Sequence, residues 1–197
     1  SEGVKKEICK LAKIKKIKIK TIYNPLIEEK NLKKLEYYKN FKKNNTKTII
    51  SVGSLKEQKN QEMLIKLFSK IDDKIDVKLL IVGSGPLKDY LKKLIKSLNQ
   101  TNRISIINFD KNIYKYYLQS HIFVLTSKWE GFGNVIVEAL HCGLEVISSD
   151  CDFGPSEILE KGKYGFLFNL DEENKCSDKL LKLLKNNQLS FNEENFH

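Results

Sequence analysis

Residues 123–143, FVLTSKWEGFGNVIVEALHCG, decide how the rest of the chain is interpreted. The run opens with the apolar residues FVL, is broken by Gly131 and Gly133, and continues with apolar residues at helical spacing. This pattern predicts a buried strand, a glycine-bearing turn and a helix. Backbone N–H groups at the amino end of a helix are unpaired and suit a phosphate or another anion. Two carboxylates flank the predicted anion site, because Glu130 precedes the turn and Glu138 lies in the helix.

Short apolar runs alternate with helical patterns on both sides of this stretch. The predicted strands cover residues 48–52, 77–82, 104–107, 123–125, 146–147 and 166–168. Alternating strands and helices predict an α/β fold with a single Rossmann-like, doubly wound parallel sheet. Before them, the alternation at residues 16–21 predicts a strand with one face in water, and residues 28–46 predict a short helix and a loop.

The carboxyl ends of parallel strands share one rim, where ligands bind in doubly wound sheets. Residues from several strands are therefore expected to meet there: Gly53, Gly83, Phe109, Ser127 and the turn at residues 130–134. Lys59 lies near the start of the helix that follows Gly53. This is where a cation would meet a bound phosphate, and lysine is a strong point charge for that purpose.

The composition narrows the range of partners. At 197 residues, with 41% hydrophobic and 30% charged residues, the chain is expected to fold as one soluble domain. The net charge of +10 comes from scattered lysines, and Arg103 is the single arginine, so no nucleic-acid partner is expected.

No apolar run approaches the ~20 residues of a membrane span, so any membrane contact is expected to be peripheral. The four cysteines lack metal or redox spacing, which fits reduced thiols in the cytosol and predicts no metal site.

Two alternatives remain open at this level. The first alternative is a nicotinamide-binding or other nucleotide-binding Rossmann protein. It rests on residues 82–88, VGSGPLK, which resemble part of a dinucleotide motif, although Lys88 occupies the third glycine position. Glu130 and Glu138 are compatible with an acid/base pair, with contacts to a polyhydroxylated ligand, or with solvated charges. A carboxylate accepts from two vicinal hydroxyls at once, so binding of ribose or hexose is the simplest interpretation.

Five segments of the chain, taken in order, resemble the carboxyl-terminal, donor-binding domain of the retaining GT-B glycosyltransferases of family 4. They are VGSLKEQKN, LLIVGSGPL, SKWEGFGNVIVEALHCGLEVISSD, GPSEI and GKYGFLF. The resemblance runs from about residue 21 to about residue 184. It implies half of a GT-B fold, with an amino-terminal acceptor domain as the partner in the complete enzyme. Residues 1–27 would then cross from that domain, residues 28–186 would form the nucleotide-sugar-binding domain, and residues 187–197 would be a polar tail.

The resemblance also implies a site. The donor would be a nucleotide sugar, expected to be a UDP-sugar, bound without a metal or another cofactor. Glu130 would face the donor sugar and Glu138 would hold the ribose, and Lys59 would assist the diphosphate. Lys59 and Glu130 are the implied catalytic residues. The full donor-binding set is Gly53, Ser54, Lys59, Phe109, Ile113, Glu130, Gly131, Phe132, Gly133, Asn134 and Glu138.

The function implied is the retaining transfer of a hexose or N-acetylhexosamine to a cell-surface glycan or lipid-linked acceptor, as in polysaccharide or lipopolysaccharide biosynthesis. It would take place in the cytoplasm or peripherally at the inner membrane face, and this chain alone would transfer nothing. Two residues depart from the family pattern, because Ser54 replaces an arginine and Ile113 replaces a proline. Because Ser54 lacks the positive charge of that arginine, it favours the alternative of a non-catalytic nucleotide-binding or partner-docking module.

Overall fold

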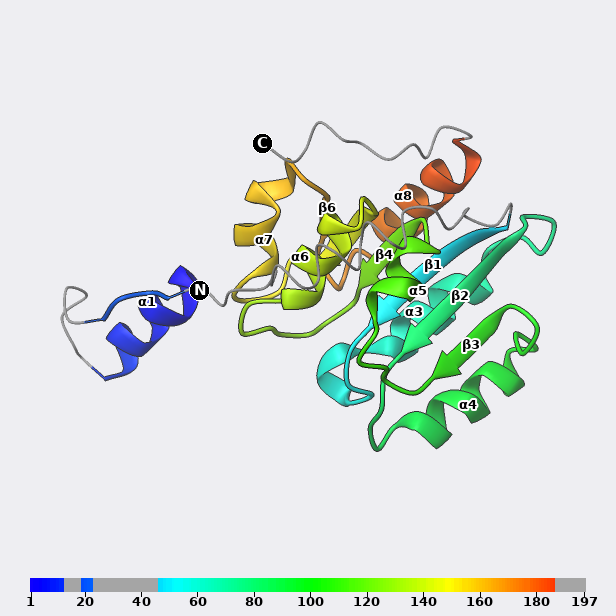
Figure 1. Cartoon of the computed structure of the whole chain (residues 1–197), viewed down its shortest axis with the longest axis horizontal. Helices are drawn as coiled ribbons and strands as arrows, with labels where there is room; N and C mark the ends of the chain where they lie inside the picture. Colours follow the sequence, from blue (N-terminus) through cyan, green and yellow to red (C-terminus); the bar gives the residue numbers. More distant parts are fainter. Residues whose placement is uncertain (13–18, 23–45, 187–197) are drawn as a thin grey trace.

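The computed structural model describes residues 1–12, 19–22 and 46–186, in which a parallel sheet is covered by helices on both faces (Figure 1). The sheet order is β3-β2-β1-β4-β5-β6, and every neighbouring pair is parallel. The strands are β1 (Lys47–Val52), β2 (Val77–Val82), β3 (Ile104–Ile107), β4 (Ile122–Leu125), β5 (Glu145–Ser149) and β6 (Phe166–Phe168). This arrangement confirms the doubly wound α/β fold that the sequence predicts.

Two apolar clusters lie on opposite faces of the sheet. Side chains alternate along β4, so that Ile122 and Val124 belong to one cluster while Phe123 and Leu125 belong to the other. The first cluster is covered by α3 (Gln61–Ser69), α4 (Lys88–Ser97) and α8 (Glu173–Lys185), and the second by α5 (Tyr114–Leu118) and α6 (Asn134–His141). All four residues of β4 are buried. A central strand covered on both faces explains why its sequence is continuously apolar.

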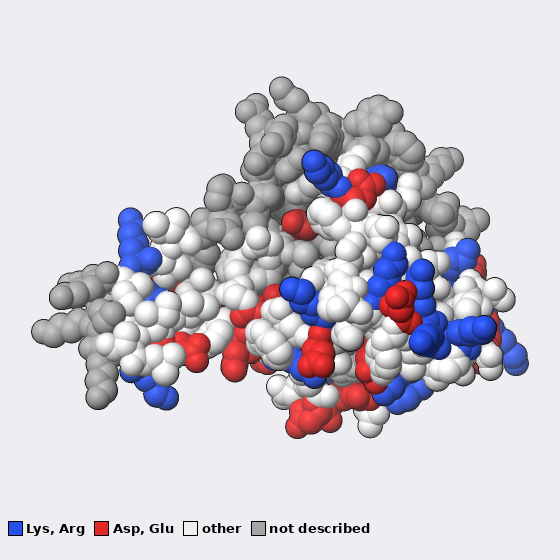
Figure 2. Space-filling model, turned by 90° about the horizontal axis from the view of Figure 1, so that it is seen from below, with Lys and Arg blue, Asp and Glu red and all other residues white. Residues whose placement is uncertain are grey.

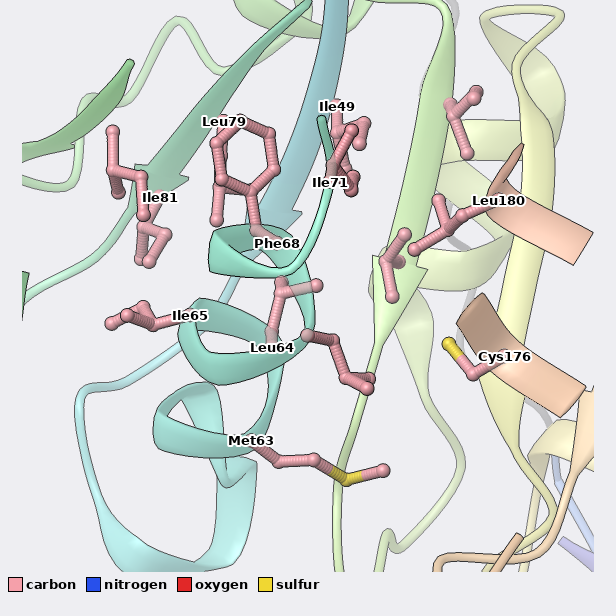
Figure 3. Close-up of a cluster of buried hydrophobic side chains, with 14 of the residues drawn as sticks. Ile49, Met63, Leu64, Ile65, Phe68, Ile71, Leu79, Ile81, Cys176 and Leu180 are labelled. Carbon is pink, nitrogen blue, oxygen red and sulfur yellow. The ribbon is translucent and has the colours of Figure 1, made fainter. Parts of the chain in front are cut away.

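Figure 3 shows the first cluster, where Phe68 of α3 lies beside Leu79 of β2 and Leu180 of α8 enters from another side. Phe68 is fully buried. Replacing a buried phenylalanine with alanine typically costs ~3–5 kcal/mol, so this packing anchors α3 to the sheet. Because α3 follows directly on the short helix η2 (Glu57–Lys59), the same packing also fixes the position of Lys59.

The amino-terminal region differs from the prediction. Residues 1–12 contain a helix, α1 (Glu2–Leu11), where the sequence indicated only a basic segment. Residues 19–22 belong to no strand, although the alternation at residues 16–21 predicted one. Residues 19–22 lie beside α1 and away from the sheet, so none of the described strands pairs with them (Figure 1). Residues 13–18, and the helix and loop predicted for residues 28–45, lie outside the described residues, as does the tail at 187–197.

None of the helices in the described ranges is long and apolar enough to cross a bilayer.

Candidate functional site

The predicted site residues gather where the strand order reverses. β1 is followed in the chain by β2 on one side of it, whereas β4 lies on its other side. The loops leaving β1 and β4 therefore part in opposite directions and leave a crevice at the carboxyl edge, which is where doubly wound sheets bind ligands. Gly53 follows β1, and the turn at residues 130–133 follows β4 and leads into α6.

Two adjoining cavities occupy this edge. The larger, of about 520 Å³, is lined by Ser1, Val4, Ile22, Lys59, Glu130, Gly131, Phe132, Gly133, Asn134 and Val135. The smaller, of about 320 Å³, is lined by Val52, Gly53, Ser54, Gly83, Ser84, Phe109, Ile113, Val135 and Glu138. Val135 lines both cavities. Every residue of the predicted donor-binding set lines one cavity or the other, so the fold brings all of them together.

The amino end of α6 opens onto the larger cavity. Gly133 is the N-cap residue, with φ of 97°, and no side chain caps the helix. The Gly133 carbonyl accepts a 2.8 Å hydrogen bond from the backbone N–H of Ile136, a 3₁₀-type contact that is common at helix ends. Asn134 and Val135, the first two helical residues, both line the cavity. No side chain in the described part of the chain caps their N–H groups, so this end of α6 is suited to an anion.

The loop after β5 supports the turn from behind. Gly154 has φ of 115°, and a Cβ atom built on it would lie 1.8 Å from the carbonyl oxygen of Phe132. The backbone N–H of Glu130 donates a 3.3 Å hydrogen bond to the carbonyl of Asp152. The GPSE segment, which the sequence indicated only as the start of α7 (Pro155–Ile158), therefore also holds the turn in place.

Lys59 and Glu130 form an ion pair inside the larger cavity. Lys59 Nζ lies 2.6 Å from Glu130 Oε1, and the exposed fractions of the two side chains are 14% and 7%. Ser127 donates a second hydrogen bond of 2.6 Å to the same oxygen. The sequence predicted that Lys59 serves the diphosphate and Glu130 the sugar, but gave no sign that the two side chains pair across 71 positions.

Backbone contacts hold Lys59 in place. Thr126 Oγ1 donates to the carbonyls of Lys59 and Asn60, at 3.1 and 2.9 Å. Gln58 bridges to the β4 loop, since its carbonyl accepts from Lys128 N–H and its amide donates to the Trp129 carbonyl. A Cβ atom at Gly53 would lie 3.2 Å from Lys59 Cε, so the lysine stem passes directly over this glycine.

Glu138 lines the smaller cavity and has a partner that the sequence did not indicate. The hydroxyl of Tyr117 donates a 3.0 Å hydrogen bond to Glu138 Oε2. Burial raises the pKa of the Glu138 carboxyl, and the hydrogen bond from Tyr117 opposes that rise. Burial, followed by the charge of Glu138, raises the pKa of Tyr117 well above its usual value, which keeps the phenol protonated as a donor.

The remaining walls come from two other segments. Phe109 is 60% exposed at the mouth of the smaller cavity, whereas Ile113 is buried beside it. Ser1 Oγ donates to the carbonyl of Gly131 at 3.1 Å, and Glu2 N–H donates to the Glu157 carboxylate at 3.1 Å. α1 therefore supplies an outer wall of the larger cavity, which the sequence did not predict.

Charges on the described surface are mixed in sign. Lys and Asp or Glu side chains are interspersed over the face seen in Figure 2. Several of them pair locally, including Lys66 with Glu62 and Lys175 with Glu172. This distribution fits the scattered lysines of the sequence better than it fits a polyanion-binding stripe.

Sequence comparison relates the chain to transferases. The sequence model of the family described as glycosyl transferases group 1 matches residues 32–195. The N-acetylgalactosamine-N,N'-diacetylbacillosaminyl-diphospho-undecaprenol 4-alpha-N-acetylgalactosaminyltransferase of Campylobacter jejuni is 38% identical over 73% of this chain and 39% of that enzyme. The N-acetyl-alpha-D-glucosaminyl L-malate synthase of Bacillus anthracis is 29% identical over 74% of this chain and 38% of its own length. The chain spans less than half the length of these relatives.

Solved structures show the same fold. A glycosyltransferase from Rickettsia africae superimposes with a TM-score of 0.76 at 24% identity, over 93% of this chain and 51% of that one. TarM of Staphylococcus aureus, solved with UDP and alpha-GlcNAc-glycerol, gives 0.70 at 27% identity, over 76% and 30%. HepE of Anabaena, solved with UDP and glucose, gives 0.65 at 26% identity, over 85% and 45%.

Proposed function

Because the chain belongs to the glycosyl transferases group 1 family, we propose that it is the donor-binding domain of a glycosyltransferase and that it holds a UDP-sugar. One observation carries this proposal. The eleven residues of the predicted donor set line two adjoining cavities at the carboxyl edge of the sheet. Related structures solved with UDP support the choice of nucleotide.

Each part of the donor has a proposed position. The uridine lies in the smaller cavity, with its base near Phe109 and Ile113 and its ribose hydroxyls donating to Glu138. The diphosphate lies against the turn at residues 131–134 and the amino end of α6. The sugar extends past it toward Glu130. Val135 lines both cavities, so they adjoin each other. This supports the assignment, because one extended ligand would then span the two cavities.

The leaving diphosphate gains negative charge as the bond to the sugar breaks. In our proposal the helix terminus and Lys59 stabilise that charge, with no bound metal. Ser54 lines the smaller cavity at the position where the family usually has a cation. Among the described residues that line the two cavities, Lys59 is therefore the one with a cationic side chain. Its pairing with Glu130 supports a position of the ammonium between the proposed diphosphate and sugar positions.

The chemistry of the relatives suggests the sugar class. Their names include an N-acetylgalactosaminyltransferase and an N-acetyl-alpha-D-glucosaminyl L-malate synthase. We therefore propose retaining transfer of an N-acetylhexosamine or hexose to a lipid-linked or cell-surface glycan acceptor. An amino-terminal acceptor domain would supply the opposite wall, and the protein would act in the cytoplasm or peripherally at the inner membrane face.

A second candidate is a nucleotide-binding or partner-docking module without catalysis. Ser54 favours it, because a serine cannot supply the positive charge that the departing diphosphate would use. Calorimetry separates the two candidates and also tests the dinucleotide alternative. The purified chain would be titrated with UDP, UDP-N-acetylglucosamine, UDP-N-acetylgalactosamine, UDP-glucose and NAD.

Weak binding of UDP and of at least one UDP-sugar is the expected result, with no transfer by the 197 residues alone. Glu138→Ala should then lose ~1–3 kcal/mol of UDP binding, the usual cost of an unpaired polar contact. Tight NAD binding without UDP binding would end the transferase interpretation. Binding of UDP with no gain or loss for any attached sugar would favour the non-catalytic module.

A further inference from the structure

Glu130 is held by only one of its two carboxylate oxygens. Lys59 Nζ and Ser127 Oγ each lie 2.6 Å from Oε1. No hydrogen bond between described residues reaches Oε2, and the residue lines the larger cavity. An ionised carboxylate accepts through both oxygens, so the second oxygen retains its capacity for a ligand.

Ser127 is itself tightly positioned. Its side chain is fully buried, and its carbonyl accepts a 2.7 Å hydrogen bond from Ser149 Oγ of β5. Ser149 in turn accepts from Ser148 Oγ at 2.9 Å through its own carbonyl. Because the Ser127 side chain is also fully buried, its hydroxyl cannot turn to solvent for a partner. The contact to Glu130 is therefore built into the end of β4.

Consecutive residues at this strand end fix both partners of the ion pair. Thr126 holds the backbone of Lys59 through its hydroxyl, and Ser127 holds the carboxylate of Glu130. A hydrogen bond to an ionised acceptor is shorter and stronger than one between neutral groups. The Ser127 hydroxyl contacts the same carboxylate oxygen as Lys59 Nζ, which gives it a role in orienting Glu130.

We propose that Ser127 is a positioning residue which, together with Lys59, fixes Oε1 of Glu130 so that Oε2 faces the sugar of the donor. This inference rests on the proposed function and deepens it. Ser127 does not touch the donor and acts through Glu130. Its hydroxyl should therefore matter for the sugar and not for the UDP portion, which lies against α6 and Glu138.

The test compares Ser127→Ala with Ser148→Ala, which removes a fully buried serine hydroxyl that does not contact Glu130. Each variant is titrated with UDP and with UDP-N-acetylglucosamine, UDP-N-acetylgalactosamine and UDP-glucose. Ser127→Ala should weaken the bound UDP-sugar about 3- to 10-fold, the usual range for one hydrogen bond, and leave UDP within about twofold. Ser148→Ala should leave the ratio of the two affinities unchanged.

A purely structural role predicts a different pattern. Equal weakening of UDP and UDP-sugar by Ser127→Ala, or no weakening of either, overturns the inference. In a Glu130→Ala background, which removes the group that Ser127 contacts, Ser127→Ala should add no further loss for the UDP-sugar, and additive losses also overturn the inference. If Ser127→Ala does not fold, Ser127→Cys keeps the size with a weaker donor and should show the same selective loss.

The proposed function and this inference fail separately. A wild-type chain that binds no UDP overturns the proposed function, and the positioning role falls with it. Intact UDP binding, together with UDP-sugar binding that does not respond to Ser127→Ala, overturns the positioning role alone.

Discussion

The hydroxyl of Tyr117 on α5 donates a 3.0 Å hydrogen bond to Oε2 of Glu138 on α6, and Tyr117 is completely buried. The two helices lie on the same face of the sheet, over the second apolar cluster. The contact orients a carboxylate at the edge of the smaller cavity while satisfying a buried phenol. In the proposed function this is the carboxylate that binds the ribose, so Tyr117 acts on the nucleoside end of the donor.

Tyr117→Phe should weaken UDP and uridine by similar factors. The variant removes the donor that orients Glu138, at a cost of ~1–3 kcal/mol from an unsatisfied, largely buried acceptor. Calorimetry with both ligands measures the effect. Tyr90→Phe is the matched control, because it also removes a tyrosine-to-glutamate hydrogen bond, in this case to Glu62 on the exposed face of α3. A loss for UDP without one for uridine would contradict a role at the ribose.

Glu138→Gln should stabilise the fold at neutral pH while it weakens UDP. Burial raises the pKa of Glu138 above the usual 4.5, so the folded state disfavours the charged form. The stability of the wild type at this site is greatest below about pH 4.5 and falls as the pH rises through the folded pKa. Glutamine carries no charge and avoids that loss, while its amide oxygen can still accept from Tyr117.

Urea unfolding at pH 7 and at pH 4 checks this sign. The variant should be more stable than the wild type at pH 7, and the difference should shrink at pH 4, where the wild-type carboxyl is increasingly protonated. A variant that is equally destabilised at both pH values would show that the carboxylate is needed for packing and is not penalised by burial.

The fold could be predicted because its signals are local. Strands β2, β3 and β6 lie at the predicted residues, since each is a short apolar run bounded by turn residues. The gathering of the donor set followed from topology alone, because carboxyl ends of parallel strands share an edge. The sequence analysis did not predict α1, whose only local signal is that Ser1 and Glu2 are suited to a helix start. In the structure, Ser1 Oγ accepts a hydrogen bond from Val4 N–H.

Pairings between distant side chains could not be read from the sequence. Glu130 is 71 residues from Lys59, and Glu138 is 21 residues from Tyr117. Such contacts depend on strand register, helix rotation and side-chain rotamers, none of which has a sequence signature. The sequence therefore identified the charged groups of the site but not the neutral donors, Ser127 and Tyr117, that orient two of them.

Lys59→Ala should weaken UDP at least tenfold more than uridine if the ammonium meets the diphosphate. The truncation also leaves Glu130 without its cation, and breaking a buried ion pair costs up to ~3–5 kcal/mol. Lys59→Ala combined with Glu130→Gln separates the effects, since the pair is then removed as a whole. Stability should recover in the double variant while UDP binding stays weak. Equal losses for UDP and uridine would argue against a phosphate role.

Gly154→Ala should disrupt the turn that carries Phe132 and the proposed diphosphate site. A Cβ atom there would lie 1.8 Å from the Phe132 carbonyl oxygen, at a φ of 115° that side chains rarely adopt. Gly162→Ala is the matched control, with φ of 100° and nothing within 4 Å of the added atom, so it should cost only the ~1–2 kcal/mol of a left-handed backbone. Thermal unfolding and UDP calorimetry should show a larger loss for Gly154→Ala in both measurements. If the two variants behave alike, backbone conformation alone explains the glycine and the contact with Phe132 does not hold the turn.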